Sequence, residues 1–253
     1  MSNGWGVHLA GIPGQAITGN IGTTNARGVS FSGAGSISGG TTSTDYASIW
    51  PYSEQYPWGA APGVVSVMSD SDDDTALGTG ARGVVLEGVD SELRPLVEVV
   101  LLDGTTPVLT AGSFTRLHMM TVVDSGSGAR NAGTITGTVS GDILSVIRPS
   151  VSRQEQATWT IPSTWGNGAI LGQTTIFVGE PQNTVVDFTL QIRPLGSNTW
   201  IQALSSSVHS QAPLIVGSET PFVFSPGMDL EFVATRSTRN NAAVFAAAEF
   251  LQL

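Results

Sequence analysis

The sequence predicts an all-β protein, built from antiparallel β-sandwich or jelly-roll modules that follow an extended N-terminal arm. Three observations support this fold class. Apolar and polar residues alternate in many short segments from Val64 onward, these segments are separated by Gly, Pro, Asn or Ser, and only one stretch has the composition of a helix. The 253 residues suffice to bury a core in one large domain or in two smaller ones.

Residues 1–60 are predicted to form the extended arm. They are rich in Gly, Ser and Thr, and their apolar islands, such as Gly28–Phe31, are short. Such a segment is either a flexible linker or an arm that becomes ordered on neighbouring chains. The arm is favoured because the stretch IWPYSEQYPW brings together four large aromatic side chains, which are usually anchored against protein: Trp50, Tyr52, Tyr56 and Trp58.

The rest of the chain is predicted to form two β modules, residues 61–150 and 151–253, divided by the polar stretch RPSVSRQEQAT. Val84–Val89 and Leu96–Leu102 are expected to pair as a hairpin. Further strands are expected at Phe114–Val123, Ile143–Ile147, Ile170–Val178, Val186–Arg193, Thr199–Ser205, Met228–Thr235 and Val244–Phe250. One interleaved sandwich is the alternative, since the order of strands along the chain does not determine which of them pair.

The C-terminal stretch AAVFAAAEFLQL has the composition of a helix, in which Val244, Ala248 and Leu251 would share one face. A strand is nevertheless predicted, because Val244, Ala246, Ala248 and Phe250 alternate with the residues between them, and a terminal strand can close a sheet. No other stretch offers a convincing helix, which excludes most α/β enzyme folds.

The charge of the chain restricts its partners. Charged residues make up 12% of the sequence, against roughly 25% in an average soluble domain. A polar but weakly charged surface is typical of interfaces between subunits. The formal net charge is −10, and no cationic face is visible for a nucleic acid. No apolar run approaches the roughly 18 residues of a membrane span, and the N-terminus lacks the pattern of a secretory signal.

Two loop motifs have a chemical interpretation and a structural one. Gly78–Gly83, GTGARG, matches the dinucleotide-binding fingerprint, but it precedes a predicted strand where that fingerprint requires a helix, so we interpret it as loop glycines. Asp70, Asp72, Asp73 and Asp74 form the densest cluster of charge. A solvated acidic turn is predicted there. Calcium binding stays open as an alternative, although the spacing is not that of an EF-hand.

No catalytic, cofactor-binding or metal-binding residue is predicted. His8, His118 and His209 belong to no nucleophile or base motif, and their spacing does not suggest zinc. His118 lies in an apolar strand and is interpreted as a packed or surface residue. Cysteine is absent, which excludes disulfides and thiolate sites, and no pair of carboxylates stands out for glycosidic cleavage. A non-enzymatic protein is therefore expected, with no cofactor.

Three stretches, in this order, resemble a family of virion structural proteins of tailed phages, including marine and cyanobacterial ones. They are IWPYSEQYPW, then DTALGTGARGVVLEGVDSELRPLVEVVLLDGTTPVLTAGSFTRL, and finally the C-terminal half with VVDFTLQIRPLGSNTWIQ, PFVFSPGMDLEFVAT and AAVFAAAEFLQL. The resemblance covers most of residues 45–253, and residues 1–44 match no family that we can name. It implies a component of the virion and transfers no catalytic residue.

This resemblance, together with the low charge, predicts a capsid decoration or cement subunit. We expect a homotrimer that contacts other virion proteins, such as the major capsid protein, while the arm reaches neighbouring chains. The alternative is a tail or fibre component, either an adaptor or a receptor-binding protein. If it binds glycans, Trp165 and Trp200 are the candidate aromatic residues outside the N-terminal patch. A hydrolytic tailspike is a third hypothesis, which predicts cleavage of host polysaccharide.

Overall fold

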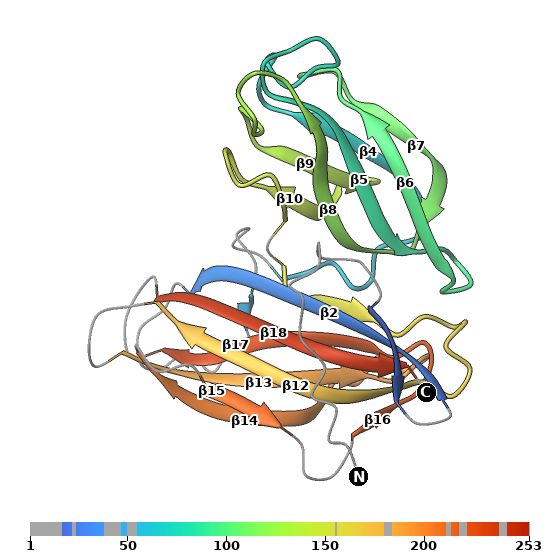
Figure 1. Cartoon of the computed structure of the whole chain (residues 1–253), viewed down its shortest axis with the longest axis vertical. Helices are drawn as coiled ribbons and strands as arrows, with labels where there is room; N and C mark the ends of the chain where they lie inside the picture. The colour runs from blue at the N-terminus through green and yellow to red at the C-terminus, as the bar shows by residue number, and fades with distance from the viewer. Residues whose placement is uncertain are drawn as a thin grey trace.

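The structure is a computed structural model, and it describes residues 17–21, 24–37, 47–49, 55–154, 156–179, 184–210, 214–217, 222–237 and 242–252. The described residues form strands and no helix, and all strand pairings are antiparallel. The predicted all-β, antiparallel class is confirmed. The strands build two sandwiches with separate cores. Figure 1 shows sandwich I, largely green, above sandwich II.

Sandwich I comprises two sheets, with strand orders β10-β9-β4-β7 (the β4 sheet) and β6-β5-β8 (the β5 sheet). Its strands are β4 (Gly63–Ser69), β5 (Ala81–Val89), β6 (Pro95–Leu101), β7 (Val108–Phe114), β8 (Arg116–Ser125), β9 (Ile135–Val139) and β10 (Asp142–Ile147). Both sheets contribute apolar side chains to the core between them, including Val65, Phe114 and Ile147 from one sheet and Val84 and Leu86 from the other.

The predicted hairpin is confirmed as β5 and β6, with Val84 opposite Val100. The strand expected at Phe114–Val123 corresponds to β8, but β7 was not predicted, because small and polar residues hide the alternation of its sequence VLTAGSF. A carboxylate covers part of the edge of β7. Glu98 on β6 accepts hydrogen bonds from the backbone N–H groups of Ala111, at 2.6 Å, and Gly112, at 2.9 Å.

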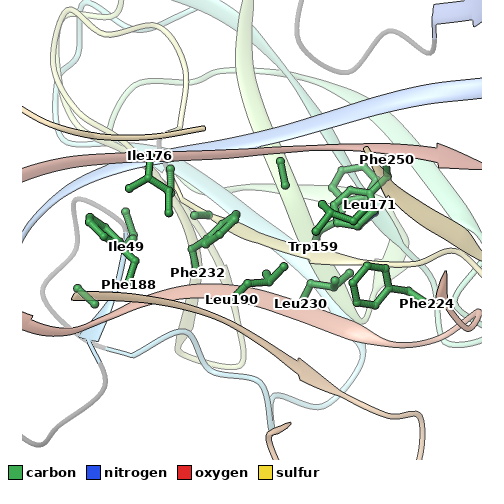
Figure 2. Close-up of a cluster of buried hydrophobic side chains, with 14 of the residues drawn as sticks. Ile49, Trp159, Leu171, Ile176, Phe188, Leu190, Phe224, Leu230, Phe232 and Phe250 are labelled. Carbon is green, nitrogen blue, oxygen red and sulfur yellow. The ribbon is translucent and has the colours of Figure 1, made fainter. Parts of the chain in front are cut away.

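Sandwich II also has two sheets: β1-β2-β18-β12-β15 with β16 beside β12 (the β18 sheet), and β11-β17-β13-β14 with β3 beside β17 (the β17 sheet). Its strands are β1 (Ile17–Ile21), β2 (Thr24–Ile37), β3 (Ala47–Ser48), β11 (Thr158–Thr160), β12 (Ala169–Val178), β13 (Val185–Arg193), β14 (Ile201–His209), β15 (Leu214–Gly217), β16 (Val223–Phe224), β17 (Asp229–Ser237) and β18 (Ala242–Gln252). Figure 2 shows the core between the sheets, where Phe188, Phe224, Phe232 and Phe250 lie with Ile49 and Trp159.

Part of the predicted N-terminal arm is built into sandwich II. β2 pairs with β18 from Gly28 opposite Leu251 to Ile37 opposite Ala242, and β1 pairs with β2. In Figure 1, β2 runs alongside β18. Ile49, further along the same segment, is buried in the core. These residues are therefore ordered on their own chain, whereas we expected them to reach neighbouring chains. Residues 1–16, Trp50 and Tyr52 lie outside the described residues.

The C-terminal stretch is a strand, as predicted. Ala246, Ala248 and Phe250 of β18 are fully buried, whereas Glu249 is exposed. This period of two follows from one face of the strand packing on the core. The same pattern occurs on β13, where Val186, Phe188 and Leu190 point into the core.

The two sandwiches meet along the start of β8, which we call the junction. The chain passes from sandwich I to sandwich II between Gln154, whose N–H donates to the carbonyl of Met120, and β11. At the junction the Tyr56 hydroxyl accepts a hydrogen bond from the N–H of Leu117 at 3.2 Å, and Gln156 Nε2 donates to the Leu117 carbonyl at 2.9 Å. Burial raises the pKa of Tyr56, so its hydroxyl stays protonated.

Candidate binding site

The aspartate cluster is not one uniform acidic patch. Asp74 is fully buried, and its carboxylate accepts hydrogen bonds from the N–H groups of Ala81, Ala132 and Gly133, at 2.6 to 2.8 Å, and from the Ser69 hydroxyl at 2.6 Å. Asp70 and Asp72 are exposed, and each accepts a hydrogen bond from a residue of another loop. The carboxylate of Asp74 thus joins the loop between β4 and β5 to the loop between β8 and β9.

The glycines of the GTGARG motif allow these loops to pack closely. A Cβ on Gly80 would lie 2.2 Å from Asp74 Oδ1, and one on Gly78 would lie 2.0 Å from the Asp73 carbonyl oxygen. Gly126 and Gly128, in the similar stretch GSGAR, donate their N–H groups to the carbonyls of Gly80 and Thr79. Because β5 begins at Ala81, the motif leads into a strand, as predicted, and it lacks the helix that binds a pyrophosphate.

His118 is buried at the junction. Its Nε2 accepts a hydrogen bond from the N–H of Thr160 at 3.1 Å, and its ring lies 4.4 Å from that of Trp159, centroid to centroid. Burial, reinforced by the charge of Arg116, lowers the pKa of His118 to about 3, so the ring is neutral near pH 7. His209 is exposed on β14, and His8 lies outside the described residues.

The two tryptophans singled out for glycan binding lie in different surroundings. Trp165 is buried against the core of sandwich II and is not available to a ligand. Trp200 is half-buried next to β14, where its ring lies 5.2 Å from that of Trp58 in an edge-to-face arrangement. Trp200 therefore remains a candidate, with Trp58 as its neighbour.

Trp58 and Trp200 line a pocket of about 290 Å³ on the outer face of the β17 sheet. The outer face follows from the alternation of β17, where Leu230 and Phe232 enter the core and Glu231 and Val233 point the opposite way. Besides the two indoles and Val233, the residues that line the pocket are polar. They are Ser48, Gln55, Thr189, Gln191, Gln202 and Glu231.

Glu231 lies at the base of this pocket, with 3% of its surface exposed. Its carboxylate accepts hydrogen bonds from the Ser48 hydroxyl, from Trp58 Nε1 at 2.8 Å and from Gln191 Nε2 at 3.2 Å. Burial raises the pKa of Glu231, and it outweighs these three donors and the charge of Arg193, all of which lower it. The carboxylate thus holds in place the side chains that shape the pocket.

Two arginines beside the pocket share one carboxylate, that of Asp229. Arg193 Nε donates to Asp229 Oδ2 at 3.1 Å, and Arg116 Nε lies 3.4 Å from Asp229 Oδ1. The Arg193 guanidinium also stacks on both indoles, 5.3 Å from the centroid of Trp58 and 5.1 Å from that of Trp200, and Arg116 lies 5.4 Å from Trp58. Such contacts hold aromatic rings in place.

No protein-family model matches the chain, and no curated protein matches it. Among solved structures, the chain is similar to one described as the structure of infectious bursal disease virus, Gx strain. The two are 12% identical, the match covers 90% of this chain and 72% of the other, and the TM-score is 0.21. A TM-score of this size does not establish a common fold, so the function has to be argued from the chain itself.

The chemistry that the pocket offers is binding by aromatic rings, amides and hydroxyls. Hydrolysis of a glycosidic bond generally uses two carboxyl groups placed about the reacting bond, and Glu231 is the one carboxylate that the described part of the chain contributes to the lining. Across the described residues, no group of three or more His, Asp or Glu side chains could hold a metal ion. The same residues include no helix that is long and apolar enough to cross a bilayer.

The sequence predicts Trp200 as a candidate but does not reveal the site to which it belongs. Trp58 falls in the predicted arm, and Glu231 is one polar position of the strand predicted at Met228–Thr235. The available signal was the row of polar residues on the outer face of β13, but that row is what any half-buried strand shows. The structure adds the finding that Thr189 and Gln191 in this row are themselves buried.

Proposed function

We propose that this chain is a non-enzymatic structural subunit of a bacteriophage particle, and specifically a capsid decoration or cement subunit. Other virion proteins hold it in place, above all the major capsid protein, and it forms a homo-oligomer, expected to be a trimer. Two observations support the proposal. One is the resemblance of three ordered stretches to structural proteins of tailed phages. The other, which carries the proposal, is an exposed apolar face of sandwich I.

This face lies on the outer side of the β5 sheet. Val97, Val99 and Leu101 alternate along β6, and each leaves at least 60% of its surface exposed. Val123 on β8 is 53% exposed. A Cβ on Gly83, in the strand between them, would lie 3.4 Å from Leu101 and 3.9 Å from Val123, so the side chains of the two outer strands approach each other across the glycine.

Such a face needs a cover. β6 is at the end of its sheet, and among the described residues it pairs only with β5. An apolar row on an edge strand invites pairing and aggregation unless it is covered. Contact with another chain in a particle would bury these side chains, and each buried Val or Leu would contribute roughly 1.5–3 kcal/mol before the costs of association.

The proposal is tested by replacing Val97 and Val99 with lysine in the phage that encodes the chain. Because both side chains are exposed, we expect the isolated double variant to keep its unfolding free energy within about 1 kcal/mol, yet not to be incorporated into particles. Val223→Lys, at a valine of sandwich II that is 58% exposed, is the matched control and is expected to be incorporated normally. Incorporation is measured by mass spectrometry of purified particles.

Imaging of the particle locates the subunit. Density for the chain on the head supports the decoration function, and density confined to the tail excludes it. Normal incorporation of the Val97→Lys, Val99→Lys double variant would show that the β6 face is not the contact surface.

The second candidate function is a tail or fibre component, either an adaptor or a receptor-binding protein. The pocket between Trp58 and Trp200 favours it, because a subunit that only fills an interface has no need of an open polar pocket. Binding of the purified protein to host cells, together with tail density, would support this function. Failure to bind host cells, with density only on the head, would exclude it.

A further inference from the structure

We propose that the pocket of Trp58, Trp200 and Glu231 binds a neutral saccharide. The inference goes beyond the structural function proposed above and holds whether the subunit lies on the head or on the tail. It rests on the chemistry of the lining, on the absence of a free charge there, on the size of the pocket and on the polar rows that extend it.

The lining combines apolar rings with uncharged hydrogen-bonding groups. Trp200 and Trp58 provide flat apolar surface, and Gln191, Gln202 and Thr189 provide amides and a hydroxyl. A sugar ring has the same dual character, because its C–H groups pack on an aromatic face while its hydroxyls both donate and accept hydrogen bonds. Amide side chains match such hydroxyls, since each has donors and an acceptor.

The charges of the site do not favour a charged ligand. Glu231 is the one ionisable residue among the described residues that line the pocket, and three donors of the protein already engage its carboxylate. The guanidinium of Arg193 is paired with Asp229 and lies against both indoles. Among the described residues, an anionic ligand would meet the Glu231 carboxylate, and the nearby guanidinium groups of Arg116 and Arg193 are both already paired with Asp229. A cationic ligand would have to compete with hydrogen bonds that are already formed.

The size and surroundings fit a short oligosaccharide. A pocket of about 290 Å³ is near the lower end of the range of roughly 300–1,000 Å³ that is usual for drug-sized ligands, which suits one or two sugar rings. Beyond Gln202, the outer face of β14 continues with Ser205 and Ser207, both exposed, and the Ser207 hydroxyl donates to Asp187 at 2.6 Å. Further rings could lie along this row of hydroxyls.

The experiment uses the purified full-length chain and a defined panel of probes. Glucose, galactose, mannose and N-acetylglucosamine are tested as single sugars and short oligomers, with glucuronic acid and sialic acid as acidic comparators and a proline-rich peptide as a ligand of another class that aromatic pockets bind. Saturation-transfer NMR detects binding, and titration of tryptophan fluorescence measures it. We expect at least one neutral sugar to bind, and the acidic sugars and the peptide not to bind.

Variants locate the binding in the pocket. Trp200→Ala is expected to weaken the binding of the neutral sugar by about tenfold, whereas Trp200→Phe, which keeps an aromatic face, loses only about threefold. Phe222→Ala is the matched control, because Phe222 is an aromatic residue 41% exposed elsewhere on sandwich II, and it should leave binding unchanged. Gln202→Ala, at an exposed position, is a second variant in case Trp200→Ala unfolds, and it is expected to weaken binding by about threefold.

Several outcomes would overturn the inference. The first is that no neutral sugar in the panel binds, and the second is that the acidic sugars bind more tightly than the neutral ones. The third is that the peptide binds and the sugars do not. The fourth is that Trp200→Ala and Gln202→Ala bind the sugar as tightly as the unchanged protein. None of these results bears on incorporation into particles, so failure here and failure of the proposed structural function are distinguishable.

Discussion

Asp74 and His118 are buried polar residues whose hydrogen-bond partners are mainly backbone N–H groups. Asp74 joins two loops at one end of sandwich I, and His118 accepts a hydrogen bond from the N–H of Thr160 at the junction. An unpaired buried polar group costs about 1–3 kcal/mol of stability, so both residues stabilise the fold only while their hydrogen-bond partners stay in place. A chain with few charges thus uses one of its carboxylates and one of its imidazoles to hold its fold together.

The neutral state of His118 predicts a dependence of stability on pH. Its pKa is about 3 in the folded protein and near 6.5 in the unfolded chain, so between these values only the unfolded chain binds the proton. Stability contributed above pH 6.5 is therefore lost as the pH falls towards 3, by about 1.4 kcal/mol per pH unit. We expect His118→Gln, which can still accept the hydrogen bond from Thr160, to reduce the slope by this amount.

The measurement is urea denaturation of both proteins at several pH values from about 7 down to about 4. His209→Gln is the matched control, because it makes the same substitution at a histidine that is exposed in the folded protein. Equal slopes for His118→Gln and the unchanged protein would show that His118 does not bind a proton differently on unfolding.

Among the strands, some have their edges covered by another part of the chain and others do not. β7 has its edge capped by Glu98, and β18 is covered along its length by β2. β6 differs, because it ends its sheet and exposes Val97, Val99 and Leu101. Natural sheets usually protect such edges, so the contrast within one molecule is a reason to expect that β6 meets another chain.

The pairing of β2 with β18 predicts the effect of shortening the N-terminus. Removal of residues 1–37 deletes β2 and turns β18 into an edge strand, so the backbone N–H groups of Ala242–Gln252 lose a partner strand. Because β18 keeps its pairing with β12, we expect the amides that face β2, about half of those in the segment, to lose protection against hydrogen exchange, while β5 and β8 of sandwich I keep theirs. Removal of residues 1–16 only, which keeps β1 and β2, is the matched control and should leave protection unchanged. Full protection of Ala242–Gln252 without residues 1–37 would contradict the pairing.

At the scale of the whole molecule, polar contacts join the two sandwiches. Asp229 of sandwich II binds Arg116 of sandwich I and Arg193 of its own sheet, and it also accepts a hydrogen bond from the Thr160 hydroxyl at 2.7 Å. The side chains of the three charged residues are at most 14% exposed. The same cluster positions Trp58, so the relative placement of the sandwiches and the shape of the pocket depend on the same charges.

The junction predicts a large effect of Asp229→Asn. The substitution keeps the shape of the side chain but leaves two buried guanidinium groups without their counter-ion, so we expect the free energy of unfolding to fall by about 3–5 kcal/mol. Asp90→Asn is the matched control. Asp90 pairs with the exposed Arg94 in a loop of sandwich I, and its loss should cost less than about 1 kcal/mol. Denaturant titration measures both changes, and similar small effects would show that Asp229 does not stabilise the junction.

The all-β class and many of the strands follow from the local sequence alone. Where one face of a strand packs on a core, every second residue must be apolar, and this local constraint is visible in Val186–Ile192 and in Val244–Phe250 without knowledge of the partner strand. The loop nature of GTGARG was also predictable, because the apolar alternation that follows it is that of a strand. These features depend on neighbours in sequence.

Which distant segments meet could be seen only in the folded chain. β2 lies beside β18 although one is near the start of the chain and the other at its end, and Trp58 reaches Trp200 and Glu231 from a segment that we had assigned to an arm. Strand pairing uses backbone groups that all residues share, and it leaves no mark in the local sequence of either strand. The binding pocket depends on such pairings, so its residues could be recognised one by one but not as a site.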